Sequence, residues 1–220
     1  AMDIDSGGTI ALNAAVTAST TVNIDASGLT TVAAAGDITA SGAVAVGAAK
    51  TGLLTTSGNI TTTNDNITFT RAVTLGGAVV LDTGANAGNI LFSSTIASAA
   101  NALTLDAGTA GNITLGALTG NGNLSVTDGA VQVYAVLTVS ALTITDATTS
   151  VTFGGAITAT SAMDIDSGGT IALNAAVTAS TTVNIDASGL TTVHADGDIT
   201  ASGAVAVGAA KTGQIGRAHV

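Results

Sequence analysis

The sequence of 220 residues contains no cysteine, proline, tryptophan or glutamate, and aromatic residues make up only 2 % of it. Without cysteine, the chain forms neither disulfides nor thiolate metal sites. Basic side chains are scarce as well: 14 aspartates stand against Lys50, Arg71, Lys211 and Arg217, and the net charge is −10. Binding to nucleic acid or to an anionic membrane depends on clustered lysine and arginine, so neither is expected as a partner.

Long hydrophobic runs are also missing, and none approaches the roughly 18 residues of a membrane-spanning helix. Membrane insertion is therefore not expected. Hydrophobic residues nevertheless make up 46 % of the chain, which is too much for a disordered segment. They are mainly alanine, valine, isoleucine and leucine, which together with the abundant threonine favour strands over helices. The composition predicts an all-β protein.

A short period of about 20 residues runs through the chain. Segments that alternate apolar and polar residues recur at this spacing, as strands with one buried face do. These segments are Leu103–Asp106, Leu124–Thr127, Leu142–Thr145, Met163–Asp166 and Val183–Asp186. Further short apolar segments lie between them, separated by glycine, asparagine, aspartate and serine, which favour turns. Each unit is therefore predicted to form three strands and three turns.

Such a unit cannot enclose a core alone, but stacked units can. If each strand pairs with its equivalent one turn away, about 4.8 Å along the axis, the inward apolar side chains form continuous columns. The sequence thus predicts a three-sided parallel β-solenoid of about 11 turns, continuous over residues 1–213. A β-sandwich also consists of short strands, but it does not explain a constant period with a constant in–out pattern.

A longer segment is present twice, because Ala1–Gly52 recurs as Ala162–Gly213 with an offset of 161 residues. The copies differ at two positions, where His194 and Asp196 replace alanines. A catalytic site is seldom repeated in this way, whereas a scaffold often is. Because 161 is close to eight periods of 20, we expect the second copy to begin after whole turns of the coil.

Three stretches of the chain, GNITLGALTGNGNLSVTDG, GGTIALNAAVTAS and DGDITASGAVAVGAAKTG, resemble the repeat regions of large bacterial exoproteins of the filamentous haemagglutinin type, and similar autotransporter passenger regions. The resemblance is one of composition and period and covers nearly the whole chain. It implies a right-handed β-helix that is secreted or displayed on the bacterial cell surface. It also implies a structural and adhesive role, with glycans or proteins of a host or of neighbouring cells as partners.

Aspartates recur singly at strand ends, at Asp82, Asp106, Asp146, Asp166 and Asp186, and are expected to be solvated turn residues. Repetition at each turn is the opposite of a unique active site, so no catalytic, cofactor-binding or metal-binding residue is nominated and the chain is not expected to be an enzyme. Alternatives remain: weak Ca²⁺ binding where Asp164 and Asp166 stack beneath Asn184 and Asp186, a metal at His194–Asp198, or a fragment of a β-helical carbohydrate-active enzyme.

Threonine ladders on a flat solenoid face order water, which makes an ice- or surface-binding protein another alternative. The outward residues of the five segments above mix threonine with serine, asparagine and aspartate, so the face that they form is not a uniform ladder. A threonine at an exposed strand position also needs no special role, because β-branched residues suit strands.

Both ends of the sequence fall inside the array, with no leader segment before Met2, so we expect a fragment whose strand edges associate end to end. Residues 214–220, QIGRAHV, do not continue the second copy. IGRAHV back-translates to a sequence similar to a common sequencing adapter, so residues 214–220 are predicted to be a non-native tail on a metagenomic fragment. The 161-residue duplication is then either genomic or a product of fragment assembly.

Overall fold

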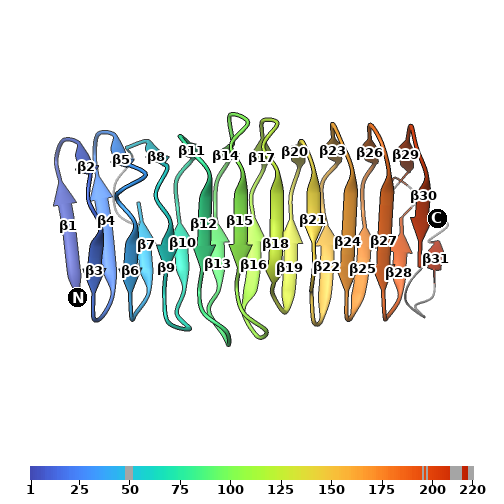
Figure 1. Cartoon of the computed structure of the whole chain (residues 1–220), viewed down its shortest axis with the longest axis horizontal. Helices are drawn as coiled ribbons and strands as arrows, with labels where there is room; N and C mark the ends of the chain where they lie inside the picture. Colours follow the sequence, from blue (N-terminus) through green and yellow to red (C-terminus); the bar gives the residue numbers. More distant parts are fainter. Residues whose placement is uncertain (48–51, 195, 197, 209–214, 218–220) are drawn as a thin grey trace.

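The computed structural model describes residues 1–47, 52–194, 196, 198–208 and 215–217, which form one elongated stack of short strands (Figure 1). The described residues contain 31 strands and no helix. Three parallel sheets form the sides of a solenoid with about 10 turns of about 21 residues, close to the 11 turns of 20 that the sequence predicts. The three-sided parallel β-solenoid is thus confirmed. No helix in this part of the chain is long and apolar enough to cross a membrane.

The three sheets share one plan, in which each strand pairs in parallel with the equivalent strand of the next turn. The first sheet contains β1(Met2–Ser6), β4(Val22–Ala26), β7(Val44–Val46), β10(Ile67–Phe69), β13(Ile90–Phe92), β16(Asn112–Leu115), β19(Val131–Tyr134), β22(Ser150–Phe153), β25(Thr170–Leu173), β28(Thr191–Val193) and β31(Ile215–Arg217). The second contains β2(Ile10–Leu12), β5(Thr30–Val32), β8(Leu54–Thr56), β11(Val73–Leu75), β14(Ile96–Ala97), β17(Leu118–Thr119), β20(Leu137–Val139), β23(Ile157–Ala159), β26(Val177–Ala179) and β29(Ile199–Ala201). The third contains β3(Val16–Ala18), β6(Ile38–Ala40), β9(Ile60–Thr61), β12(Val79–Asp82), β15(Leu103–Asp106), β18(Leu124–Asp128), β21(Leu142–Ile144), β24(Met163–Ser167), β27(Val183–Ala187) and β30(Val205–Val207).

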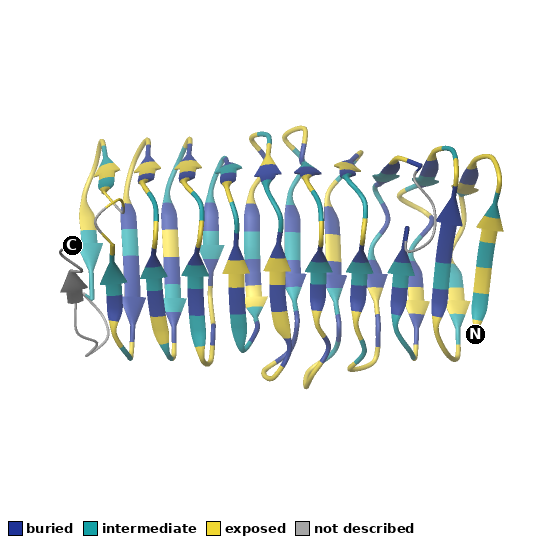
Figure 2. Cartoon of the chain, turned by 180° about the vertical axis from the view of Figure 1, so that it is seen from behind, coloured by how far each residue is buried: buried dark blue, intermediate teal, exposed yellow. Residues whose placement is uncertain are grey.

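The core lies along the axis, because most strands point their first and third residues inward and the middle one outward (Figure 2). In β11, for example, Val73 and Leu75 are buried while Thr74 is exposed. Residues of one type stack between turns, and the rings of Phe69 and Phe92 lie 4.5 Å apart, centroid to centroid. Since each turn contacts mainly its two neighbours, stability builds up along the stack rather than around one centre.

The turns differ in length, and the corners absorb the difference. Strand partners lie 18 residues apart at Leu124 and Leu142 but 24 apart at Val79 and Leu103. Longer turns bulge at a corner and return to the same strand register, so the inward columns continue. The period is therefore a mean, and the sequence cannot be divided into turns by counting residues.

Equivalent residues of the two long copies lie on different sides of the solenoid, so the expectation that whole turns separate the copies was wrong. The first copy begins with β1 in the first sheet, whereas the second begins with β24 in the third sheet. Within each copy the pairing is the same: Met2 pairs with Val22, and Met163 with Val183. The reason is that the intervening turns are longer than 20 residues on average, so 161 residues complete seven turns and two further sides.

The predicted tail at residues 214–220 is described only over the backbone of β31, which pairs with β28. Residues 214 and 218–220 lie outside the described residues. Lys50 and Lys211 lie outside them as well. The non-native origin of the tail stays a prediction.

Candidate functional site

A column of six aspartates follows the strand ends of the third sheet, and we call it the acidic column: Asp82, Asp106, Asp128, Asp146, Asp166 and Asp186. Asp82 pairs in register with Asp106, and Asp166 with Asp186. Several of these carboxylates accept a hydrogen bond from a nearby glycine amide, as Asp82 does from Gly84 at 2.7 Å. Such bonds tie the corner turn to the strand that precedes it.

The carboxyl of Asp128 lies in the middle of the acidic column. Partial burial raises the pKa of Asp128 above its ordinary value of 3.8. The hydrogen bond from the Gly129 amide lowers the pKa, whereas the neighbouring carboxylates of Asp146 and Asp106 raise it again. A net raised pKa means that the folded protein holds the charged form of Asp128 at a cost.

The expectation that these aspartates are solvated holds only in part. Asp146 is exposed, and Asp82, Asp106 and Asp166 are half-buried. For Asp186 the expectation was wrong, because its side chain is only 2 % exposed. The equivalent Asp25 in the first copy is 1 % exposed. Alternation alone places both residues outward, so their burial could not be predicted from the strand pattern.

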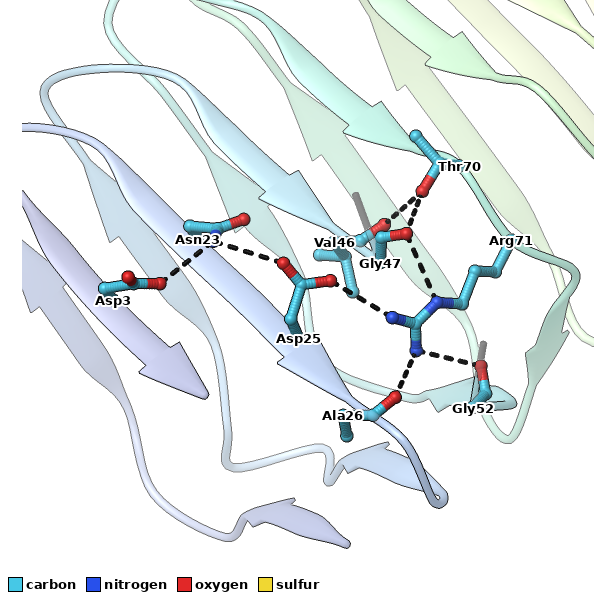
Figure 3. Close-up of polar contacts among 9 residues, drawn as sticks. All are labelled: Asp3, Asn23, Asp25, Ala26, Val46, Gly47, Gly52, Thr70 and Arg71. Atoms are coloured by element: carbon cyan, nitrogen blue, oxygen red, sulfur yellow. Dashed lines mark hydrogen bonds and ion pairs between the residues drawn. The ribbon is translucent and has the colours of Figure 1, made fainter. Parts of the chain in front are cut away.

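Asp25 lies in the most extensive polar cluster that the structure describes, built around Arg71 (Figure 3). The Arg71 guanidinium donates to the Asp25 carboxylate at 3.1 Å and to the backbone carbonyls of Ala26, Gly47 and Gly52 at 2.8, 3.2 and 2.9 Å. The Arg71 side chain is only 9 % exposed. One cation therefore joins segments from three successive turns.

Asn23 extends this cluster toward the first turn. Its amide donates to the carboxylates of Asp3 and Asp25 at 2.9 and 3.2 Å. The second copy repeats the arrangement, with Asn184 donating to Asp164 and Asp186 at 2.9 and 3.1 Å. An amide between two carboxylates relieves their repulsion without a cation.

The register on which the calcium alternative depends is confirmed, since Asp164 pairs with Asn184 and Asp166 with Asp186. Calcium binding itself stays a prediction. In the described part of the chain no group of three or more histidine or carboxylate side chains could hold a metal ion. His194, Asp196 and Asp198 are all exposed, whereas residues 195 and 197 of the predicted cluster lie outside the described residues.

A second polar cluster lies inside the solenoid and was not predicted. The Tyr134 hydroxyl donates to Gln132 Oε1 at 2.7 Å, and Gln132 Nε2 donates to the carbonyl of Asp146 at 2.9 Å. Both side chains are fully buried. Burial raises the pKa of Tyr134 well above its ordinary value of 10.0, so the phenol remains a hydrogen-bond donor. The cluster is closed upon itself and offers no group to a ligand.

A nearly continuous row of threonines lies on the second sheet, whereas the five alternating segments named from the sequence lie in the third sheet. We call it the threonine column: Thr31, Thr55, Thr74, Thr119, Thr138, Thr158, Thr178 and Thr200. Each is the outward residue of its strand, and Ala97 is the one interruption between Thr31 and Thr200. The signal was present in the sequence as threonine after Leu118, Ile157 and Val177.

Taken together, the described polar groups are spread along the solenoid rather than gathered at one place. The buried carboxylate of Asp25 is already engaged by Arg71, and the acidic column carries about one carboxylate per turn. No protein-family model, no curated protein and no solved structure matches the chain.

Proposed function

We propose that the chain is a non-catalytic stalk segment of a secreted or cell-surface bacterial adhesin. The observation that supports this proposal is the continuous parallel pairing of three sheets over about 10 turns. At about 4.8 Å per turn, the ten intervals between the eleven strands of the first sheet make a rod about 48 Å long. A rod of this kind holds whatever lies at its far end away from its anchor.

The distribution of side chains agrees with a mechanical role. Stiffness arises because each turn hydrogen-bonds to both neighbours along all three sides, so bending the rod strains three ladders together. Apart from the buried Asp186, the carboxylates of the acidic column are exposed or half-buried at the corners and give the rod a negative outer edge. Glycans or proteins of a host or of neighbouring cells are the partners that this proposal assigns to its lateral surface.

The proposal is tested by changing the length of the rod in register. The chain is placed between an outer-membrane anchor and a distal antigen-binding module, and capture of antigen-coated beads by the cells is measured. Residues 137–176 comprise two turns, because Leu137, Ile157 and Val177 pair in register. Deleting them shortens the rod by about 10 Å and lowers capture through a surface polysaccharide layer.

The matched control removes residues 137–146 alone, which breaks the register and is expected to abolish surface display. Equal bead capture by the full rod and the two-turn deletion, at equal display, contradicts a stalk. Release of reducing ends from offered polysaccharides by the purified chain contradicts a non-catalytic role. The contiguous gene is expected to encode a secretion signal upstream of this segment.

A further inference from the structure

The outer surface of the second sheet has two outward columns that are almost free of charge, and it differs from the first sheet, whose outward column mixes threonine with alanine, leucine and valine. One is the threonine column. The other contains the residue before each strand, and we call it the aliphatic column: its apolar members are Leu29, Leu53, Ala72, Ala117, Val136, Ala156 and Ala176, and its polar members are Thr9, Thr95 and Asp198. Between Thr9 and Ala176 neither column contains a charged side chain, and the first to do so is Asp198.

The two columns are regular because the ladder continues through both. Thr138, Thr158 and Thr178 pair directly with one another. The residues of the aliphatic column accept backbone hydrogen bonds from the preceding turn, as Val136 does from Leu118 at 2.9 Å. Side chains therefore repeat every 4.8 Å or so along the rod, and the columns lie about 6.7 Å apart along the strands.

The chemistry of this flat face is that of hydroxyls and methyls. A threonine in a strand has few χ1 rotamers, so its hydroxyl and methyl are held in a fixed relation to the sheet. Within the described chain, only Thr119 of the eight uses its hydroxyl on a protein group, the Ile96 carbonyl at 3.3 Å. Three aliphatic side chains of the neighbouring column are well exposed: Leu29 at 42 %, Leu53 at 68 % and Val136 at 44 %.

The lack of charge, the burial of the aromatic side chains and the small area of the flat face limit the classes of molecule that it can bind. An uncharged face does not complement nucleic acid, charged lipid or an ionic mineral. Sugar rings stack on aromatic side chains, but Phe69, Phe92, Phe153 and Tyr134 are all buried. A face about 43 Å long and about 10 Å wide offers roughly 430 Å², about half of what each partner contributes to a standard protein interface, so neither a second copy nor a globular protein would be held stably.

We propose that this flat face adsorbs to ice. The partner that fits is uncharged, periodic and rich in hydrogen-bonding groups, and the spacing of the solenoid turns is close to the repeat of oxygen atoms along the a axis of hexagonal ice. Hydroxyls at that spacing hold water in positions compatible with the lattice, while the methyls and the aliphatic column exclude water that does not fit. The proposal goes beyond the stalk role and does not depend on it.

The test uses the full chain and pure ice. The fraction of protein that partitions into a slowly grown ice hemisphere is measured together with thermal hysteresis, with serum albumin as the non-binding reference. The variant T138K/T158K places two ammonium groups on the flat face. The matched control T114K/T152K places them on outward positions of β16 and β22, in the first sheet.

We expect the wild-type chain and the control to partition into ice and the flat-face variant to lose at least about tenfold of that partition, equivalent to about 1.4 kcal/mol. Partition of the wild-type chain no better than albumin overturns the proposal. Equal loss in both lysine variants overturns it too, because a general charge effect then suffices. Retention on crystalline cellulose without partition into ice assigns the face to a glycan instead and likewise overturns it.

If the lysine pair lowers the urea midpoint, T138S/T158S takes its place. Serine keeps both hydroxyls and removes only two methyls, so the fold is retained. We expect partition to fall here as well, since the methyls help to exclude mismatched water. Unchanged partition of the serine variant contradicts the role assigned to the methyls and, with it, this account of the face.

Discussion

Replacing Arg71 with methionine tests how far one buried cation secures the irregular corner of the first copy. The change removes the ion pair to Asp25 and the hydrogen bonds to the carbonyls of Ala26, Gly47 and Gly52. Asp25 is 1 % exposed, so its buried charge loses the hydrogen-bonded Arg71 guanidinium. Breaking a buried pair in this way costs about 3–5 kcal/mol, and the hydrogen bonds belong to the same loss because they share one group.

The effect is expected to be local, and the duplication supplies an internal reference. Hydrogen exchange by mass spectrometry reports it, since peptides spanning residues 24–38 and 185–199 differ in mass at the two positions where the copies diverge. We expect exchange in the first peptide to accelerate by about a hundredfold or more while the second is unchanged. The double variant D25N/R71M should recover part of the loss, because the Asp25 charge is removed together with the Arg71 charge. Equal exchange in R71M and wild type over residues 24–38 would refute the reasoning.

Three further predictions concern single side chains and use circular dichroism during urea unfolding. D128N should stabilise the protein at pH 7 by up to about 1 kcal/mol, because the folded state raises the Asp128 pKa and so penalises its charged form. The gain should disappear as the pH falls below 3.8, where Asp128 becomes protonated in both the folded and the unfolded state, and a gain that persists there contradicts the prediction. G169A should be strongly destabilising, since a Cβ there would lie 1.7 Å from the Thr149 carbonyl oxygen. G8A changes the same position in the first copy, where the Cβ would meet only the Ser6 hydroxyl at 3.8 Å, and should be tolerated; equal destabilisation by the two substitutions refutes this prediction. Y134F should cost about 1–3 kcal/mol, because it leaves the buried Gln132 Oε1 without its donor, and Q132L/Y134F should restore part of that loss. A neutral Y134F would mean that Gln132 finds another donor.

Much of the fold follows from local pattern. Three-residue strands with an in–out–in order, such as Ile157–Ala159, specify which side chains enter the core whatever side they occupy. For the same reason the pattern cannot tell one side from another. The offset of the long copies was misjudged because corner lengths, and not strands, decide how many sides 161 residues complete.

The polar clusters were harder to predict because they depend on contacts between turns. Arg71 meets Asp25 across 46 residues, a separation of about two turns that includes an unusually long corner. Gln132 and Tyr134 occupy inward positions where the pattern expects apolar residues, and their placement is tolerable because they hydrogen-bond to each other and Gln132 also donates to the Asp146 carbonyl. The threonine column, by contrast, is visible in the sequence, because threonine follows the first apolar residue of the second strand in most units.

The second long copy begins one side short of eight whole turns after the first, and this offset has a consequence for recognition from outside. An epitope within the shared segment faces one direction near one end of the rod and a direction about a third of a revolution away near the other. An antibody fixed on one flank of the rod therefore meets one copy and not both. Duplication of a segment in the gene therefore changes the direction that its surface faces on the rod. A copied surface can then meet a different partner although no residue of the core is altered.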